Sequence, residues 1–427
     1  MIAIMNNSMY LSRFKSYIQS LGLYFLASLI PMVISLVTNP LIAMNMSPED
    51  YAIVGYYGAF NVLFGSFVNF YLIHYYTKRF FEVTDEERIE LKATLFKMLV
   101  WFSLFLTVVA LGLLYLYISI FNSDSQIAFW PYAFLSLFSL PIVGIYNLTL
   151  VEYRMQRNAK KFFNLSLSNG LLAVSLSLIF VVVFKWGALG KLGSILLASL
   201  IIFCYVVYLN KDIFKVHFNI EIFKTSVKFC FPLVLAAMLT FFSNGYDKVF
   251  LEKAGDLVQL GYYTVAVSMA GYISIFTTSI NSTFQPDVFQ SIVERNFRKC
   301  FKYIILKLAI VSVIVVLFIL FCPLIIKILT AGRYVDSTPF ARILSLSVLT
   351  SMLYYSMSEI TIALGYTKIT LINKIIGSIL SVVLFSILIT RLGAYGAAWG
   401  TVFSFLIFFI GNSILVIARY QKQKSNI

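Results

Sequence analysis

Long apolar runs, separated by short polar and charged segments, recur along the whole 427-residue chain. A helix of about 20 apolar residues spans the ~30 Å hydrocarbon core of a bilayer, and its backbone hydrogen bonds are satisfied internally. Hydropathy along the chain predicts twelve transmembrane helices, over residues 20–43, 52–76, 94–120, 127–150, 165–184, 192–209, 229–250, 257–284, 303–330, 339–364, 369–390 and 393–418. The pattern therefore predicts an all-α polytopic membrane protein.

The basic residues are distributed unevenly among the predicted loops. With twelve spans both termini lie on one side, and a cytoplasmic N-terminus places 25 of the 33 Lys and Arg residues on cytoplasmic segments or nearby helix ends. The other eight are Lys185, Lys191, Lys248, Lys253, Lys327, Arg333, Arg342 and Arg391. The positive-inside rule predicts that both termini are cytoplasmic. The net charge of +15 then reflects topology and attraction to anionic lipids, so no nucleic-acid partner is expected.

Three sequence pairs recur at nearly constant offset. Pro31 in "IPMVIS" and Pro232 in "FPLVLA" lie 201 residues apart, and "KWGALG" and "RLGAYG" begin 206 residues apart. Lys161 with Gly170, and Lys368 with Gly377, repeat at an offset of 207. This order predicts two pseudo-symmetric six-helix bundles, residues 1–210 and 229–427, joined by a cytoplasmic linker at 211–228. Halves with an even number of spans share one orientation, as in transporters that bind substrate between their halves.

Composition, loop length and cysteine spacing argue against several classes of function. Hydrophobic residues make up 60% of the chain, and the predicted loops are too short for a soluble catalytic domain, so no enzyme activity is expected. The four cysteines lack the spacing of a disulfide framework or a metal site, and no metal or other cofactor is predicted. The first apolar run is longer than a signal-peptide core, so we expect it to be retained. The two largest loops, 78–91 and 211–228, are interpreted as solvated connectors that form short amphipathic helices at the membrane surface.

Several segments carry a family resemblance. They are "MNMSPEDYAIVGYYGAF", "DLVQLGYYTVAVSMAGYI", "TAGRYVDSTPFARILSLS", "LGYTKITLINKIIGSIL" and "RLGAYGAAWGTVFSFLI". The chain resembles, over nearly its whole length, the polysaccharide-exporter branch of the multidrug/oligosaccharidyl-lipid/polysaccharide (MOP) superfamily, and within it the bacterial O-antigen flippases most closely. Ala52 departs from the pattern, where the family places glycine.

This resemblance implies a flippase in the bacterial inner membrane. Its substrate would be an undecaprenyl-diphosphate-linked oligosaccharide, moved from the cytoplasmic to the periplasmic leaflet by alternating access, with H⁺ or Na⁺ as a coupling ion. Membrane lipids, a polysaccharide polymerase and a chain-length regulator are the implied partners. A protein is needed for this movement, because glycan and diphosphate groups cannot cross hydrocarbon without a polar path.

Asp247 and Lys248, at the end of the seventh predicted span, are the first candidate site residues. The family carries an acidic residue at the Asp247 position, usually followed by a basic one. If that span is a continuous helix from about residue 228, Asp247 lies about 28 Å along it, near the periplasmic interface. Two interpretations remain open: a role in the cavity or its gating, and an interfacial anchor with Lys248 extended toward water.

Glu359 and His74 are candidates for ion coupling. Glu359 lies within the tenth predicted span and could exchange a proton inside the membrane, or it could be a hydrogen-bonded packing residue. His74 titrates near neutral pH when unperturbed, but its place among tyrosines near Lys78 also suits an interfacial residue.

Basic residues near the cytoplasmic ends are candidate contacts for a diphosphate, through charge-assisted hydrogen bonds. They are Lys78, Arg79, Arg154, Arg157, Lys160 and Lys161. Charges that only set the topology are the competing explanation. Polar residues inside the spans are expected to line the cavity and bind sugars, or else to join neighbouring helices. These are Thr38, Asn39, Asn61, Asn69, Asn244, Asn281 and Gln285.

Two other functions remain in competition. A small-molecule cation antiporter of the multidrug-extrusion type shares the expected fold, but it should carry acidic residues deep in the first six spans, which have none. A membrane glycan polymerase would need a large periplasmic loop, which the chain lacks.

Overall fold

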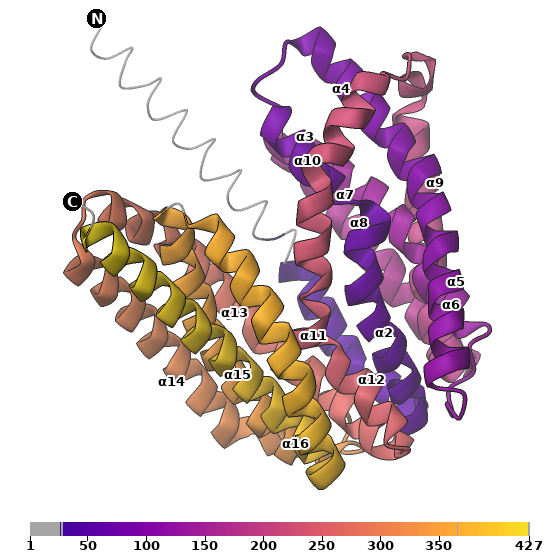
Figure 1. Ribbon diagram of the computed structural model, residues 1–427. Helices are drawn as coiled ribbons and strands as arrows, with labels where there is room; N and C mark the ends of the chain where they lie inside the picture. Colours follow the sequence, from indigo (N-terminus) through magenta and orange to yellow (C-terminus); the bar gives the residue numbers. More distant parts are fainter. Residues whose placement is uncertain (1–25, 27–28, 365, 426–427) are drawn as a thin grey trace, which may run out of the picture. The chain divides into compact units, whose positions relative to one another are not determined.

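The protein is built from α-helices. The computed structural model describes residues 26, 29–364 and 366–425, and no strand occurs in this part of the chain (Figure 1). Among these residues nine helices are long and apolar enough to cross a membrane, and Leu29–Asn45 forms a shorter apolar helix. The predicted all-α polytopic membrane protein is confirmed. The count of twelve spans and the cytoplasmic position of the termini stay predictions, and residues 20–25, 27 and 28 of the first predicted span lie outside the described part.

Contacts divide the chain into two compact units. The first unit comprises residues 1–45, 64–116 and 129–234, and the second comprises residues 46–63, 117–128 and 235–427. The division therefore falls inside the helices α2 (Pro48–Asn69), α5 (Ser103–Phe121) and α10 (Ile220–Met238). The second unit thus contains two short pieces from the first half of the sequence. The predicted six-helix bundles, and a linker at 211–228, stay a proposal; α10 already begins at Ile220, inside that linker.

The remaining helices of the first unit follow one another through short turns. They are α3 (Leu72–Arg79), α4 (Asp85–Lys97), a π-helical turn (Met98–Phe102), α6 (Tyr132–Leu137), α7 (Ser139–Met155), α8 (Ala159–Ser177), a second π-helical turn (Leu178–Val183), α9 (Gly187–Leu209) and a 3₁₀ turn (Lys211–Lys215). The expected surface helix at 78–91 is wrong in detail, because α4 continues through the π turn and α5 as one helical stretch, Asp85–Phe121. Thr84 begins it with a capping box in which Glu87 is the reciprocal partner.

A buried polar cluster lies in the first unit. The Lys92 ammonium on α4 lies 2.7 Å from the Glu152 carboxylate on α7 and donates to Asn210 Oδ1 at 2.7 Å. Both charged side chains are largely buried, so each offsets the desolvation cost of the other. The pair joins helices that are far apart in sequence.

The remaining helices of the second unit are longer. They are α11 (Phe241–Asn244), α12 (Tyr246–Lys253), α13 (Leu257–Val293), α14 (Phe297–Leu329), a 3₁₀ turn (Val335–Ser337), α15 (Thr338–Ala363) and α16 (Thr367–Ser425). The two last predicted spans meet at Gly393 within α16, where φ is 55° and the helix kinks. Gly396 and Gly400 allow close packing, because a Cβ at Gly396 would strike the Leu388 backbone and one at Gly400 would strike the Phe385 ring.

The seventh predicted span is interrupted. The α10 helix ends at Met238, α11 has only four residues, and Gly245 separates α11 from α12. A Cβ at Gly245 would lie 2.8 Å from the Phe241 ring and 3.2 Å from the Ala59 carbonyl oxygen, so the close approach favours glycine there. The continuous helix that placed Asp247 about 28 Å along its axis is therefore wrong.

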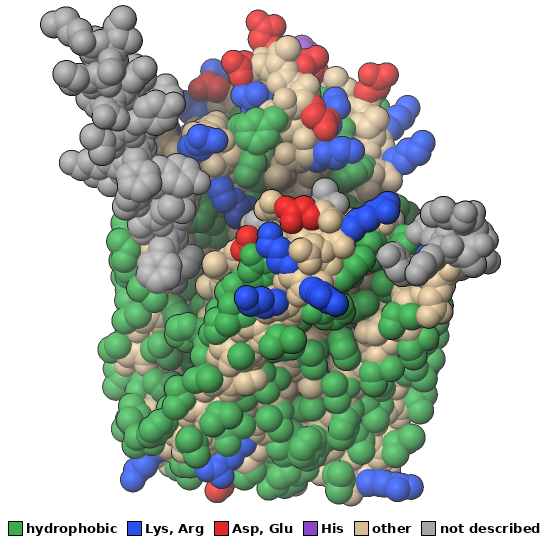
Figure 2. Space-filling view, turned by 90° about the vertical axis from the view of Figure 1, so that its left-hand side faces the viewer, with side chains coloured by type: hydrophobic (Ala, Val, Ile, Leu, Met, Phe, Trp, Pro, Cys, Tyr) green, Lys and Arg blue, Asp and Glu red, His purple; other side chains and the backbone are tan. Residues whose placement is uncertain are grey.

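The exposed surface of the described helices is largely hydrophobic. Large apolar side chains remain exposed along the long helices, for example Phe105 at 61% and Leu320 at 65% of their surface. Figure 2 shows hydrophobic side chains over much of the surface in that view, with Lys, Arg, Asp and Glu side chains mainly in its upper half and a few at its lower edge. This surface suits a lipid environment rather than water.

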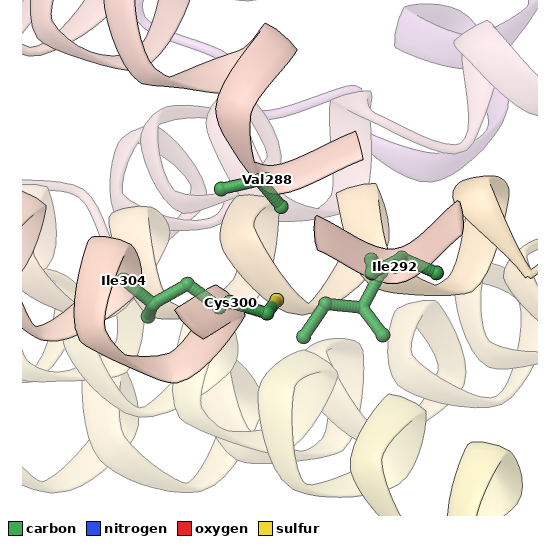
Figure 3. Close-up of a cluster of buried hydrophobic side chains, with 5 residues drawn as sticks. Val288, Ile292, Cys300 and Ile304 are labelled. Carbon is green, nitrogen blue, oxygen red and sulfur yellow. The ribbon is translucent and has the colours of Figure 1, made fainter. Parts of the chain in front are cut away.

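Apolar packing joins α13, α14 and α15 at one end of the second unit. Val288, Ile292, Cys300, Ile304 and Ile360 form a buried cluster, four of which are labelled in Figure 3. All five side chains are at least 90% buried. The cluster holds these three helices together where two of them carry buried charges.

Candidate functional site

A polar cavity lies within the second unit. Its volume is about 490 Å³, within the range of roughly 300–1,000 Å³ typical of small-molecule sites. Its walls come from the interrupted segment α11–α12 and from α13, α15 and α16. Interrupted helices supply binding groups in many transporters, because their ends expose polar backbone and turn the helix direction.

The walls of the cavity are rich in hydroxyl and amide groups. Nineteen residues line it: ten carry an uncharged hydroxyl or amide side chain, and Asp247 and Lys248 are the two charged ones. Serine and threonine side chains project from one face of α13, at Ser274, Thr277 and Thr278. Spacings of three and four residues place side chains on one face of a helix, so α13 presents a hydroxylated stripe to the cavity.

Asp247 is held by a tyrosine on the neighbouring helix α13. Tyr263 is fully buried, and its hydroxyl donates to Asp247 Oδ2 at 2.5 Å. Thr401 Oγ1 lies 3.4 Å from the same tyrosine oxygen. The second carboxylate oxygen, Oδ1, is buried without a hydrogen bond, and the Lys248 ammonium lies 3.8 Å from it. Three helices, α12, α13 and α16, therefore position one carboxylate.

The geometry decides between the two interpretations of Asp247 and Lys248. Only 4% of Asp247 and 8% of Lys248 is exposed, whereas an interfacial anchor must extend its charged end into water. The anchor interpretation is therefore wrong for this structure. Their placement in the cavity wall leaves a role in binding or gating as a proposal.

Glu359 belongs to a second buried group of charges, next to the cavity. Asn281, a lining residue on α13, donates from Nδ2 to Glu359 Oε1 at 2.7 Å. The Lys307 ammonium on α14 donates to Glu359 Oε2 and to Asn281 Oδ1, each at 2.9 Å. Lys307 is fully buried and Glu359 is 5% exposed. The three side chains form a closed hydrogen-bonded ring behind the cavity wall.

This ring changes the expectation for Glu359. The sequence left open whether Glu359 exchanges a proton or is a hydrogen-bonded packing residue. The structure pairs it with Lys307, as in the hydrogen-bonded alternative, and proton exchange stays a proposal. Protonation of Glu359 would leave a buried ammonium without its counter-charge. Lys307 was not among the predicted site residues, because the ninth span was expected to begin near residue 303 and Lys307 therefore lay close to its end. The helix begins at Phe297, which places Lys307 well inside it.

Four polar candidates meet at this cavity and the others do not. Asn244 and Asn281 line it together with Asp247 and Lys248. The remaining predicted polar residues, Thr38, Asn39, Asn61, Asn69 and Gln285, are not in its wall. Thr38 donates to the Ile34 carbonyl of its own helix, and Asn69 belongs to the first unit.

The basic candidates lie in the first unit. Arg154, Arg157 and the neighbouring lysines 160 and 161 are exposed, and Lys78 is exposed next to the half-buried Arg79. Arg79 forms an exposed ion pair with Glu82 at 3.0 Å, and His74 stacks on Tyr71 with ring centroids 4.5 Å apart. Their roles in docking and in coupling stay proposals.

Sequence reasoning missed the cavity residues whose side chains carry a hydroxyl group. Tyr263 and Thr401 contact the Asp247 carboxylate or its partner, but neither differs by type from many other tyrosines and threonines in the chain. Lys307 could have been identified from the sequence, because it lies in the apolar run "YIILKLAIVSVIVV". Placing an unpaired lysine inside the membrane costs free energy, so a partner was to be expected. Among the residues that the structure describes, no group of three or more His, Cys, Asp or Glu side chains could hold a metal ion.

The described helices form the fold of a multi-pass membrane protein, and solved structures of membrane transporters have a similar fold. A structure titled as a multidrug resistance MATE family transporter of the MOP superfamily, in an inward-facing conformation, is similar with a TM-score of 0.71, 16% identity and coverage of 93% of this chain and 99% of that one. The lipid II flippase MurJ in an inward closed conformation matches with a TM-score of 0.67, 19% identity and coverage of 92% and 87%. A MOP superfamily transporter from Pyrococcus furiosus matches with a TM-score of 0.56, 16% identity and coverage of 93% and 96%. At these identities the likeness concerns the fold.

The family follows from the sequence match. Residues 18–292, more than half of the chain, match the family described as "Polysaccharide biosynthesis protein". The chain belongs to this family, and it shares its fold with transporters of the MOP superfamily. A bacterial inner-membrane location agrees with that family. No curated protein sequence matches the chain.

Proposed function

We propose that the protein is a flippase for undecaprenyl-diphosphate-linked oligosaccharide, such as an O-antigen or related surface polysaccharide unit. It would move the glycan from the cytoplasmic to the periplasmic leaflet by alternating access. The observation that carries the proposal is the cavity of about 490 Å³, in which ten of the nineteen lining residues carry a hydroxyl or amide side chain. Sugars bind through many such groups, and each buried polar group of the glycan needs a partner away from water.

Family and neighbours support this choice of substrate. The matched family is described by its role in polysaccharide biosynthesis, and one structural neighbour is named a lipid II flippase. A lipid-linked glycan leaves its prenyl tail in the bilayer, so only the polar head needs a protein path. Exposed Arg154 and Arg157 would then attract the diphosphate from the cytoplasmic leaflet.

Coupling to H⁺ or Na⁺ is part of the proposal. Proton coupling through Glu359 would require the Glu359–Lys307–Asn281 ring to open during transport, because a protonated carboxyl group no longer balances the Lys307 charge. If Glu359 is the coupling group, replacing it by Gln removes the pH dependence of transport. An unchanged pH profile in Glu359→Gln would eliminate this role.

A cation antiporter is the second candidate, since the MATE transporter likeness reaches a TM-score of 0.71. Such a protein would extrude cationic dyes, and its cavity would be expected to carry excess negative charge. In this cavity the single carboxylate of Asp247 is matched by Lys248. Purified protein in vesicles with a dye such as ethidium therefore serves as the competing assay.

The test is a reconstituted flipping assay. Vesicles would contain an undecaprenyl-diphosphate-linked glycan, and a membrane-impermeant glycan-modifying enzyme would report its movement between leaflets. Ser351→Leu places an apolar side chain into the cavity and should slow flipping about tenfold, the equivalent of ~1.4 kcal/mol. Ser413→Leu is the matched control, because Ser413 is also half-buried in a helix but lies outside the cavity wall. Ethidium movement without glycan movement would instead establish the antiporter.

A further inference from the structure

The charges at the cavity cancel in pairs. Asp247 and Lys248 lie 3.8 Å apart in its wall, and Glu359 and Lys307 lie 2.9 Å apart directly behind Asn281. At such distances the field of each pair falls off much faster than that of a single charge. The cavity therefore offers hydrogen bonds in many directions but little net potential.

A further lysine near the cavity is compensated only in part. Lys374 lines a smaller neighbouring pocket of about 30 Å³, which shares Tyr355 and Phe405 with the large cavity. Its ammonium donates to the Ala236 carbonyl oxygen at 3.3 Å, in the last turn of α10. The carbonyl end of a helix carries partial negative charge, which offsets the ammonium.

One acceptor in the wall is left open. Asp247 Oδ1 is buried without a hydrogen bond, whereas Oδ2 is occupied by Tyr263. A ligand hydroxyl or amide N–H would satisfy this oxygen, and the adjacent Lys248 ammonium would serve a ligand oxygen. A carboxylate at the same place would face the unsatisfied Asp247 oxygen and would have to lose its hydration, which is costly because the Lys248 charge is already balanced by Asp247.

We propose that this cavity takes an uncharged sugar ring, such as a hexose or an N-acetylhexosamine, and that the Asp247–Lys248 pair discriminates against acidic sugars. This inference rests on the proposed flippase function and assigns its substrate class. Asp247 excludes a sugar carboxylate, and Lys248 prevents Asp247 from selecting a cationic sugar. Removal of either charge should therefore shift the preference in opposite directions.

The experiment compares two substrates that differ at one group. Undecaprenyl-diphosphate-linked disaccharides ending in glucose or in glucuronate would be reconstituted with the purified protein, and the initial flipping rates compared. The wild-type protein should flip the glucose form about tenfold faster. Asp247→Asn should shift the rate ratio about tenfold toward glucuronate, Lys248→Gln should shift it further toward glucose, and the double variant should return near the wild-type ratio.

The ratio separates specificity from folding. A variant with little folded protein lowers both rates equally and leaves their ratio unchanged, so a ratio that moves in opposite directions in the two variants reports the charges. Equal rates for both glycans in the wild type, or a ratio that neither variant moves, would overturn this inference while leaving the flippase function in place. If the wild-type protein flips neither glycan, the flippase function itself fails, and the inference fails with it.

Discussion

Lys307 on α14 and Glu359 on α15 form an ion pair of 2.9 Å in which the lysine is fully buried. Asn281 on α13 bonds to both partners. The apolar cluster of Figure 3 begins beside them, because Ile304 lies one turn before Lys307 and Ile360 follows Glu359 in the chain. Three helices therefore meet at a polar group inside an apolar environment.

Replacing one partner of this ion pair should lower the free energy of unfolding more than replacing both. Lys307→Met leaves the Glu359 charge buried and unpaired, and we expect a loss of about 3–5 kcal/mol in the free energy of unfolding. The double variant Lys307→Met/Glu359→Gln removes both charges and should be more stable than Lys307→Met alone. Denaturant titration of the detergent-solubilised protein measures each value. Additive effects of the two single substitutions would contradict a direct pair.

The loop between α5 and α6 is held by a buried carboxylate. Asn122 Nδ2 and Ser125 Oγ each donate to Glu252 on α12 at 2.6 Å, and Glu252 is 3% exposed. Glu252→Ala leaves these donors unsatisfied, so we expect a loss of about 1–3 kcal/mol per unpaired group. Glu252→Gln, which keeps an acceptor oxygen, should lose less.

An exposed glutamate provides the control for Glu252. Glu86 on α4 is exposed, and Glu86→Ala should change the free energy of unfolding by less than about 0.5 kcal/mol. Thermal unfolding of the purified variants would rank them. Equal losses in Glu252→Ala and Glu86→Ala would contradict a structural role of the buried carboxylate.

Gly261 allows two helices to approach closely. A Cβ there would strike the backbone of Pro48, whereas a Cβ at Gly58 would meet nothing within 4 Å. We expect Gly261→Ala to destabilise the protein by about 1–3 kcal/mol through overpacking. Gly58→Ala should stabilise it by about 0.5–1 kcal/mol, because alanine favours the helix. The difference in sign, measured by thermal unfolding, distinguishes helix contact from a general effect of replacing glycine.

Arg154 and Arg157 offer a test of substrate docking. If they attract the diphosphate, Arg154→Gln/Arg157→Gln should raise the glycan concentration for half-maximal flipping about threefold to tenfold, since exposed charge contacts are individually weak. Lys224→Gln/Lys228→Gln is the control with the same change in charge at two other exposed positions. Equal flipping in both double variants, with topology preserved, would show that these arginines only set the orientation in the membrane.

Most of the helical architecture follows from the sequence, but the interruption of the seventh span does not. Hydropathy averages over about 19 residues, so it merges α10, α11 and α12 into one apolar run. The break at Gly245 depends on contacts with Phe241 and Ala59, which a linear pattern cannot contain. For the same reason Asp247 was placed near an interface rather than in a buried wall.

The candidate site was predictable where charged or amide side chains interrupt apolar runs. Asp247, Lys248, Asn244 and Asn281 were identified because polar groups in apolar runs are costly, and all four line the cavity. Tyr263 could not be identified in this way, since a tyrosine in an apolar helix needs no special explanation.

The amino-acid sequence alone determined that the protein is a helical membrane protein, because apolar segments long enough to cross a bilayer leave few alternatives. The match to the polysaccharide biosynthesis family also comes from the sequence. Tertiary structure decided which polar groups meet. The partners of Glu359 and Asp247 lie 52 and 16 residues away in the chain, and only the packing of α12 to α16 brings them within hydrogen-bonding distance. Burial and pairing of charges depend on three-dimensional neighbours, whereas insertion into lipid depends on the hydrophobicity of each segment.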